Sequence, residues 1–117
     1  MARHNATGRK GEQLAVEWLK SKGYEILHVN WRYSHYEIDV VAVKDEMLHF
    51  IEVKTRRTEN FGFPEEAVDD VKINRLLNAG EEFLEQNDGW KRIQYDVLAI
   101  SINSSGTEYF LIEDVYD

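Results

Sequence analysis

Charged and apolar residues alternate in two neighbouring runs near the middle of the chain. A period of two residues is typical of β-strands, so the pattern predicts one strand over residues 36–43 and a second over residues 47–54. The short polar stretch between them, residues 44–46, predicts a turn. The two strands would then pair as an antiparallel hairpin whose register the turn sets.

The predicted hairpin brings four charged residues together. Side chains alternate between faces along a strand, so Glu37 shares a face with Asp39, and Glu52 shares one with Lys54. With an Asp-Glu dipeptide at the centre of the turn, Asp39 lies opposite Glu52 and Glu37 lies opposite Lys54. That dipeptide lacks the glycine that two-residue turns favour, and a three-residue loop would change the register.

Two carboxylates facing each other need a physical reason. Like charges opposite one another destabilise a sheet, and a carboxylate on a half-buried strand is costly to desolvate. A divalent cation between Asp39 and Glu52 would remove both costs, and Mg²⁺ or Mn²⁺ prefers such oxygen ligands. Lys54 beside them could orient a water or neutralise a phosphate. The alternative is a solvent-facing sheet surface with ordinary charges.

Similar patterns predict the other elements and their order, α-β-β-β-α-β-β. The first is a helix that Thr7 can cap and that runs to about Lys22, where Gly23 ends it. The others are a strand over 24–32, a loop over 55–63, a helix from Pro64 to about Gln86, and strands over 93–102 and 107–115. A helix between the third and fourth strands permits a right-handed crossover to a parallel neighbour. We therefore expect an α/β fold, with a mixed sheet flanked by helices and the apolar run 97–100 buried on both faces.

Length and composition indicate one domain over residues 1–117 in a reducing compartment. The chain has 117 residues, of which 43% are hydrophobic and 31% charged, and it has no cysteine. Disulfides, thiolate metal sites and thiol nucleophiles are thereby excluded. The N-terminus has no apolar leader, and no run approaches membrane-spanning length. A cytoplasmic protein with no membrane partner is the expectation.

The net charge of −8 is unevenly distributed. Residues 1–58 carry ten Lys/Arg and eight Asp/Glu, whereas residues 59–117 carry four and fourteen. The acidic second half argues against tight, nonspecific DNA binding and is either a solvated face or a surface for a basic protein partner. The basic residues expected to face phosphate are Arg9, Lys10, Arg32, Lys54, Arg56 and Arg57.

Several short motifs resemble those of a known family. They are residues 8–12 (Gly-Arg-Lys-Gly-Glu), 30–32 (Asn-Trp-Arg), 37–39 (Glu-Ile-Asp), 50–56 (Phe-Ile-Glu-Val-Lys-Thr-Arg), 61–62 (Phe-Gly) and Lys72. In this order, through most of the chain, they resemble the YraN-like bacterial proteins. That family is in turn similar to the PD-(D/E)xK nucleases, which include restriction endonucleases and Holliday-junction resolvases. The resemblance implies a restriction-endonuclease-like fold.

The resemblance also implies roles for individual residues. By position, Asp39 and Glu52 resemble the metal-binding acids, joined by the carbonyl of Val53, and Lys54 resembles the motif lysine. Glu12 resembles a helix-borne glutamate that reaches the metal in several resolvase-like members. The implied cofactor is Mg²⁺ or Mn²⁺. Secondary candidates are Glu37 and Lys72.

Two positions depart from the family pattern. Tyr36 stands where the family usually has glycine, and its bulk would narrow the approach of a backbone phosphate. Gln94 stands where the family favours arginine, which removes one candidate phosphate contact.

Other polar residues have ordinary interpretations beside the functional ones. Glu12 could simply interact with the helix dipole, and Lys72 could be a solvated surface lysine. His49 has the opposite parity to Glu52 and should face away from the site. Asp96 is either a buried polar partner or a distal member of the site, and the pattern does not choose between these.

Three functional hypotheses follow. The first is a Mg²⁺- or Mn²⁺-dependent endonuclease acting on structured DNA, such as a branched or flapped intermediate of recombination or repair; cutting two strands would favour a homodimer. The second is a non-cutting module that binds nucleic acid or a partner protein. The third is a role in protein assembly without nucleic acid.

Overall fold

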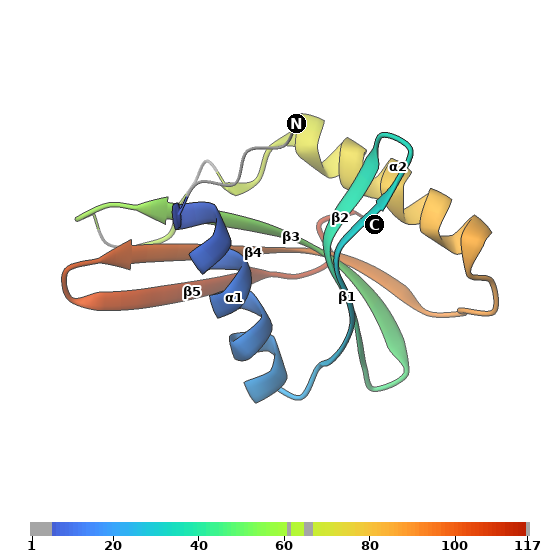
Figure 1. Ribbon diagram of the computed structural model, residues 1–117, viewed down its shortest axis with the longest axis horizontal. Coiled ribbons are helices and arrows are strands. Elements are labelled where there is room, and N and C mark those ends of the chain that lie inside the picture. The colour runs from blue at the N-terminus through green and yellow to red at the C-terminus, as the bar shows by residue number, and fades with distance from the viewer. Residues whose placement is uncertain (1–5, 61, 65–66, 117) are drawn as a thin grey trace.

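The computed structural model describes residues 6–60, 62–64 and 67–116 of the chain, so Phe61 of the Phe-Gly motif lies outside the described residues. The elements are α1 (Ala6–Ser21), β1 (Glu25–Tyr33), β2 (Tyr36–Lys44), β3 (Met47–Arg57), α2 (Asp70–Gln86), β4 (Ile93–Asn103) and β5 (Gly106–Ile112) (Figure 1). This order confirms the predicted α-β-β-β-α-β-β arrangement.

The five strands form one mixed sheet in the order β1-β2-β3-β4-β5. Neighbouring strands are antiparallel except β3 and β4, which α2 joins as a parallel pair. The predicted crossover is therefore confirmed. Parallel pairing needs a long connection, and the helix supplies it.

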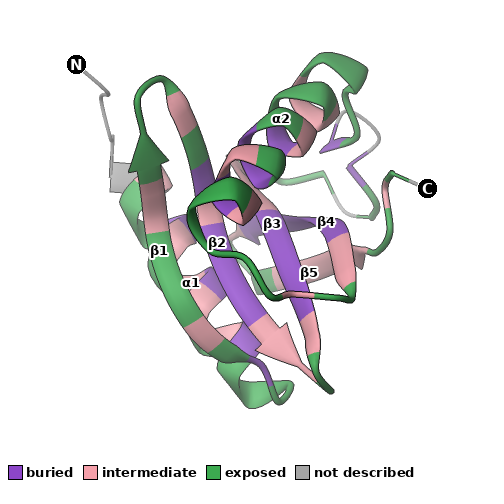
Figure 2. Cartoon of the chain, turned by 90° about the vertical axis from the view of Figure 1, so that its right-hand side faces the viewer, coloured by how far each residue is buried: buried purple, intermediate pink, exposed green. Residues whose placement is uncertain are grey.

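The two helices cover opposite faces of the sheet (Figure 2). Ala15 and Leu19 of α1 pack in one buried cluster with Ile51, whereas Phe83 of α2 packs in another with Phe50. Because adjacent strand residues point to opposite faces, these two clusters lie on either side of β3. The central strands are buried, and β1 is a largely exposed edge (Figure 2).

The fourth strand has the burial that its apolar run predicts. Residues 97–100 are buried, with exposed fractions between 0% and 2%. Such a run alternates between the α1 and α2 faces and contributes to the core on both.

The β2–β3 turn has the two-residue geometry predicted from its length. Asp45 and Glu46 both have positive φ, at 53° and 66°, and Lys44 pairs with Met47. Two successive positive φ values match a type I′ turn, whose twist suits a hairpin even where glycine is absent. The register therefore runs as predicted from the turn to the pair of Val40 and Ile51.

The predicted start of the second helix was wrong. Residues Pro64 and Ala67 lie before α2, which begins at Asp70. Asp69 is the N-cap, because its carboxylate accepts hydrogen bonds from the backbone amides of Val71 and Lys72. This cap, rather than the proline, sets the beginning of the helix.

Three further boundaries differ from the prediction. Residues 55–57 belong to β3 rather than to a loop, because they continue the ladder with β4 as far as the pair of Arg57 and Ile102. The last strand ends at Ile112 rather than at residue 115, where the chain bends at Asp114 with φ 59°. Thr7 lies inside α1 instead of preceding it.

The end of α1 matches the prediction. The helix ends at Ser21, and Gly23 follows with φ 96°. The amide of Gly23 donates to the carbonyl of Lys20, as in a helix that glycine terminates. No helix among the described residues is long and apolar enough to span a membrane.

Candidate functional site

Asp39 and Glu52 lie close together at the point where β2 and β3 stop pairing. The ladder between these strands ends at Val40 and Ile51, one residue before the predicted pair of acids. In place of the next rung, the carboxylate Oδ2 of Asp39 accepts a hydrogen bond from the backbone amide of Val53 at 2.8 Å. The strands therefore diverge at the acids, which leaves room beside them.

Both carboxylates have raised pKa values. Burial is the main cause of the raised pKa of Asp39; Glu12 and Glu37 raise it further, while the Val53 amide and Lys54 oppose the change. Burial, and then the charge of Asp39, raises the pKa of Glu52 from an ordinary 4.5 to about 7. Charged acids in this position repel each other, so the pair favours either a proton or a cation.

Lys54 is held next to a second lysine. Burial lowers the pKa of Lys54, and the neighbouring Lys72 of α2 lowers it further. Glu52 and Asp69 act in the opposite direction. The helix thus brings Lys72 to the same site as the hairpin acids, and this lysine is not a remote surface residue.

A groove of about 540 Å³ opens beside the acids, between the hairpin and α2. Asp39 and Glu52 lie on its hairpin side, and Lys72 and Arg75 lie on its helix side. Tyr36 also lines it, in the position where the resemblance expects glycine. Lys54 lines a separate cavity of about 230 Å³ instead.

Glu12 reaches the site from the other side of the sheet. Its Oε1 accepts a hydrogen bond from Nδ2 of Asn30 at 3.1 Å, and its charge contributes to the raised pKa of Asp39. Gly11 permits this approach, because a Cβ there would overlap the side chain of Thr55 on β3. Gly11 of the 8–12 motif is thus needed for close helix–strand packing.

The carboxylate oxygens of Asp39 and Glu52 are suitable ligands for a divalent cation, although the described part of the chain does not present a complete set of ligands around one point. Among the described residues, no group of three His, Asp or Glu side chains could hold a metal ion. The hydrogen bond from the Val53 amide uses only Oδ2 of Asp39, so Oδ1 remains available as a ligand. Glu52 lies close enough to Asp39 for the two charges to interact. Two carboxylates with water suit Mg²⁺ or Mn²⁺. The predicted contribution of the Val53 carbonyl stays a prediction.

The residues expected to face phosphate are dispersed. Arg32 is ion-paired with Glu37 at 3.7 Å, with both side chains largely exposed. Arg56 donates from Nε to the hydroxyl of Ser101 at 2.9 Å and from Nη2 to the carbonyl of Gly62 at 3.3 Å, which anchors the loop after β3.

The remaining basic candidates also lie away from the main groove. Arg9 and Lys10 lie on α1, where Arg9 lines a separate hollow with Val29, and Arg57 ends β3. None of these residues, nor Arg32 or Arg56, lines the 540 Å³ groove among the described residues.

Arg75 is a basic groove residue that the sequence analysis missed. It lies three positions after Lys72 on α2, and residues at that spacing are neighbours on a helix surface. The Lys72–Arg75 spacing was therefore an available signal for a basic helix face above the acids.

Comparisons with known proteins identify the family. The model described as "Uncharacterised protein family UPF0102" matches residues 11–100, which span α1 to β4. A UPF0102 protein of Christiangramia forsetii is 40% identical over 116 residues, covering 99% of this chain and 98% of that protein. The UPF0102 protein of Parabacteroides distasonis is 38% identical over 117 residues, covering 100% and 94% respectively. A third relative, UPF0102 protein FP2501 of Flavobacterium psychrophilum, is 43% identical over 100 residues, covering 86% and 84%.

Proposed function

This chain belongs to the uncharacterised protein family UPF0102, and from that premise we propose that it is a Mg²⁺- or Mn²⁺-dependent endonuclease acting on structured DNA. The family membership agrees with the YraN-like motifs in the sequence. Their similarity to the PD-(D/E)xK nucleases supports the reaction type, which is hydrolysis of a phosphodiester.

The observation that carries the proposal is the half-buried acid pair at the divergence of β2 and β3. Asp39 and Glu52 each have a raised pKa, and burial is the first cause for both. A fold does not need two facing acids there, since like charges destabilise a sheet. Perturbed acids beside an open groove are typical of functional sites.

The basic residues around the groove suit a phosphodiester. Lys72 and Arg75 line its helix side, where they would bind the negatively charged backbone of the substrate. Lys54, with its lowered pKa, would hold or accept a proton from the attacking water. Glu12 would complete the acid set from α1.

Asp39 and Glu52 would hold the cation, with Glu12 contributing directly or through water. When bound, Mg²⁺ or Mn²⁺ supplies Lewis-acid stabilisation of negative charge on the scissile phosphate. The protein's own part is to keep the two carboxylates close, to orient Asp39 through the Val53 amide, and to keep Lys54 beside them.

A cleavage assay on branched, flapped and linear DNA in Mn²⁺ tests the proposal. We expect cleavage of a branched or flapped substrate by the wild type, and a loss of at least about 100-fold in Asp39→Asn and in Lys54→Met. Glu81→Gln, an exposed change on α2 outside the groove, is the matched control and should cleave as the wild type does. Full activity in Asp39→Asn or Lys54→Met would reject this mechanism.

Calorimetric titration of Mn²⁺ at low ionic strength tests the metal separately. Binding should occur in the wild type and in Glu81→Gln, and it should be lost in Asp39→Asn. Since this measurement uses no DNA, it distinguishes a failure of the metal site from a wrong choice of substrate.

A second candidate function is a module that binds nucleic acid or a partner protein without cutting. Two observations favour it: Tyr36 lines the groove, and no three acids among the described residues could hold a metal ion. Binding of branched DNA that weakens with salt, without cleavage under any metal, would support this candidate over the nuclease.

A further inference from the structure

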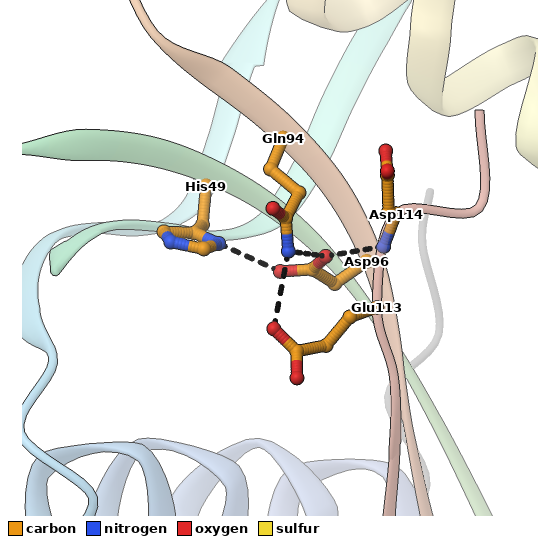
Figure 3. A network of polar contacts seen from close by, with 5 residues as sticks. All are labelled: His49, Gln94, Asp96, Glu113 and Asp114. Carbon is orange, nitrogen blue, oxygen red and sulfur yellow. Dashed lines mark hydrogen bonds and ion pairs between the residues drawn. The ribbon is translucent and has the colours of Figure 1, made fainter. Parts of the chain in front are cut away.

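A buried His–Asp pair lies on the face of the sheet opposite the candidate active site. His49 is 4% exposed and Asp96 is fully buried, and His49 Nδ1 lies 2.8 Å from Asp96 Oδ2 (Figure 3). The other carboxylate oxygen of Asp96 accepts from Gln94 Nε2 and from the backbone amide of Asp114, both at 2.9 Å. Asp96 is thus satisfied from three sides.

The pair fixes the orientation of the imidazole ring. A carboxylate at Nδ1 favours the proton on that nitrogen, which directs Nε2 away from Asp96 (Figure 3). Within the described ranges, Nε2 of His49 has no hydrogen-bond partner. His49 lines a pocket of about 310 Å³, so its free nitrogen is available to a ligand there.

Cationic side chains surround this pocket. Lys22, Lys44 and Arg92 come from the end of α1, the end of β2 and the segment before β4, and all three line it with His49. The protein carries a net charge of −8, so three cations around one small pocket are not a consequence of overall composition.

Neighbouring groups hold these cations in place. Lys22 Nζ lies 5.3 Å from the centre of the Trp18 ring, and Lys44 Nζ lies 5.0 Å from that of Tyr24. Because the lysines cover these ring faces, stacking of an aromatic ligand is disfavoured. Arg92 Nη1 donates to the backbone carbonyl of Asp45 at 3.3 Å and retains other donors.

Two carboxylates also line the pocket, Asp45 and Glu113. Glu113 already accepts from Gln94 Nε2 at 3.2 Å, within the Asp96 network. The three cations that line the pocket outnumber these two carboxylates, while the third carboxylate nearby, Asp96, lies behind His49 and is occupied by hydrogen bonds from His49, Gln94 and the Asp114 amide. The excess, the free ring nitrogen and the small volume suit a compact anion rather than a base or a peptide.

We propose that this pocket is a second binding site, for a small ligand that carries a phosphate group. His49, oriented by Asp96, accepts through Nε2 a hydrogen bond from the hydroxyl of a protonated phosphate group, and Arg92, Lys22 and Lys44 supply charge-assisted hydrogen bonds to its other oxygens. The site is independent of the proposed nuclease activity, since it uses none of the groove residues on the α2 face.

The network also tethers the C-terminal segment, through the Asp114 amide to Asp96 and the Val115 amide to the Tyr95 carbonyl. A purely structural role would account for these contacts and for the buried carboxylate. It would not account for three cations that line the same pocket as the histidine. The test must therefore measure a ligand and not only stability.

The experiment is a titration of the full chain with inorganic phosphate, followed by the ring ¹⁵N and ¹H resonances of His49. The same titration with chloride at matched ionic strength is the reference for screening. Arg92→Gln changes an exposed pocket residue, and Lys91→Gln changes its exposed neighbour, which does not line the pocket. Melting curves check that both variants fold.

We expect a saturable phosphate-dependent shift at His49 that chloride does not produce. Arg92→Gln should raise the dissociation constant about fivefold, as expected for one charge-assisted contact, and Lys91→Gln should leave it within about twofold. No saturable shift beyond that with chloride would overturn the site. Equal weakening in both variants would also overturn it, since general surface charge would then explain the binding.

Discussion

The carboxylate of Asp39 accepts a hydrogen bond from the backbone amide of Val53 at 2.8 Å, in place of the next rung of the β2–β3 ladder. Asp39 thus accepts the hydrogen bond of a strand amide through Oδ2, while its other oxygen, Oδ1, belongs to the acid pair. A buried amide needs a partner, and here a functional candidate provides it. Substitutions at Asp39 can therefore separate structure from chemistry.

Asp39→Ala should destabilise the fold relative to Asp39→Asn. Alanine leaves the Val53 amide without its acceptor, whereas the Asn carbonyl can still accept that hydrogen bond. We expect a difference of about 1 kcal/mol in the free energy of unfolding, measured by urea denaturation. Both variants should lose Mn²⁺ binding. Equal stabilities would show that the Asp39–Val53 hydrogen bond does not support the strand junction.

The stability of the protein should depend on pH through Glu52. Its pKa is about 7 in the folded protein and 4.5 ordinarily, so the folded state retains a proton that the unfolded state loses. The stability that this group contributes is present below about pH 4.5 and is lost as pH rises through about 7.

Glu52→Gln isolates this contribution, because glutamine is uncharged at every pH. Relative to the wild type, the variant should gain about 2 kcal/mol of stability between pH 5 and pH 8, allowing for partial solvent screening. Urea denaturation of both proteins at pH 5, 6.5 and 8 measures the difference. A difference that stays constant with pH would contradict the raised pKa.

The sequence predicts the fold well where the alternation of apolar and polar residues continues over many positions and fits only one element type. The hairpin register follows from alternation and a two-residue turn, and the buried strand follows from the run 97–100. Element ends are less predictable, because they depend on tertiary contacts. Pro64 has the local character of a helix start, yet the carboxylate of Asp69 caps α2.

The candidate site is predictable only in part, because a local pattern determines some of its residues and tertiary packing determines the others. Asp39 and Glu52 meet because strand parity determines which residues share a face. Contacts between distant elements are not encoded in any local period. The approach of Lys72 to Lys54, the pairing of Arg32 with Glu37 and the anchoring of Arg56 all depend on how elements pack.

Gly80→Ala should destabilise the protein although alanine favours helices. A Cβ on Gly80 would lie 2.6 Å from Tyr95 Cε2 and 2.9 Å from Phe50 Cδ2, and neither ring can move easily in the core. Overpacking should exceed the gain in helix propensity, for a net loss of about 1–2 kcal/mol in urea denaturation. Glu81→Ala, at an exposed neighbouring position, should stay within about 0.5 kcal/mol of the wild type. A stabilised Gly80→Ala variant would show that α2 is not packed this closely.

Lys72→Gln should raise the pKa of both Lys54 and Glu52. The charge of Lys72 disfavours a second ammonium on Lys54 and favours the carboxylate of Glu52, so its removal reverses both effects. The ¹³Cε shift of Lys54 and the side-chain carboxyl shift of Glu52, followed by NMR as the pH is raised, measure the two titrations. Arg75→Gln is the matched control, because Arg75 lines the same groove but contributes to neither shift. Upward movement of both pKa values in Lys72→Gln alone would establish the coupling across the groove, whereas unchanged titrations would mean that α2 and the hairpin acids do not interact electrostatically.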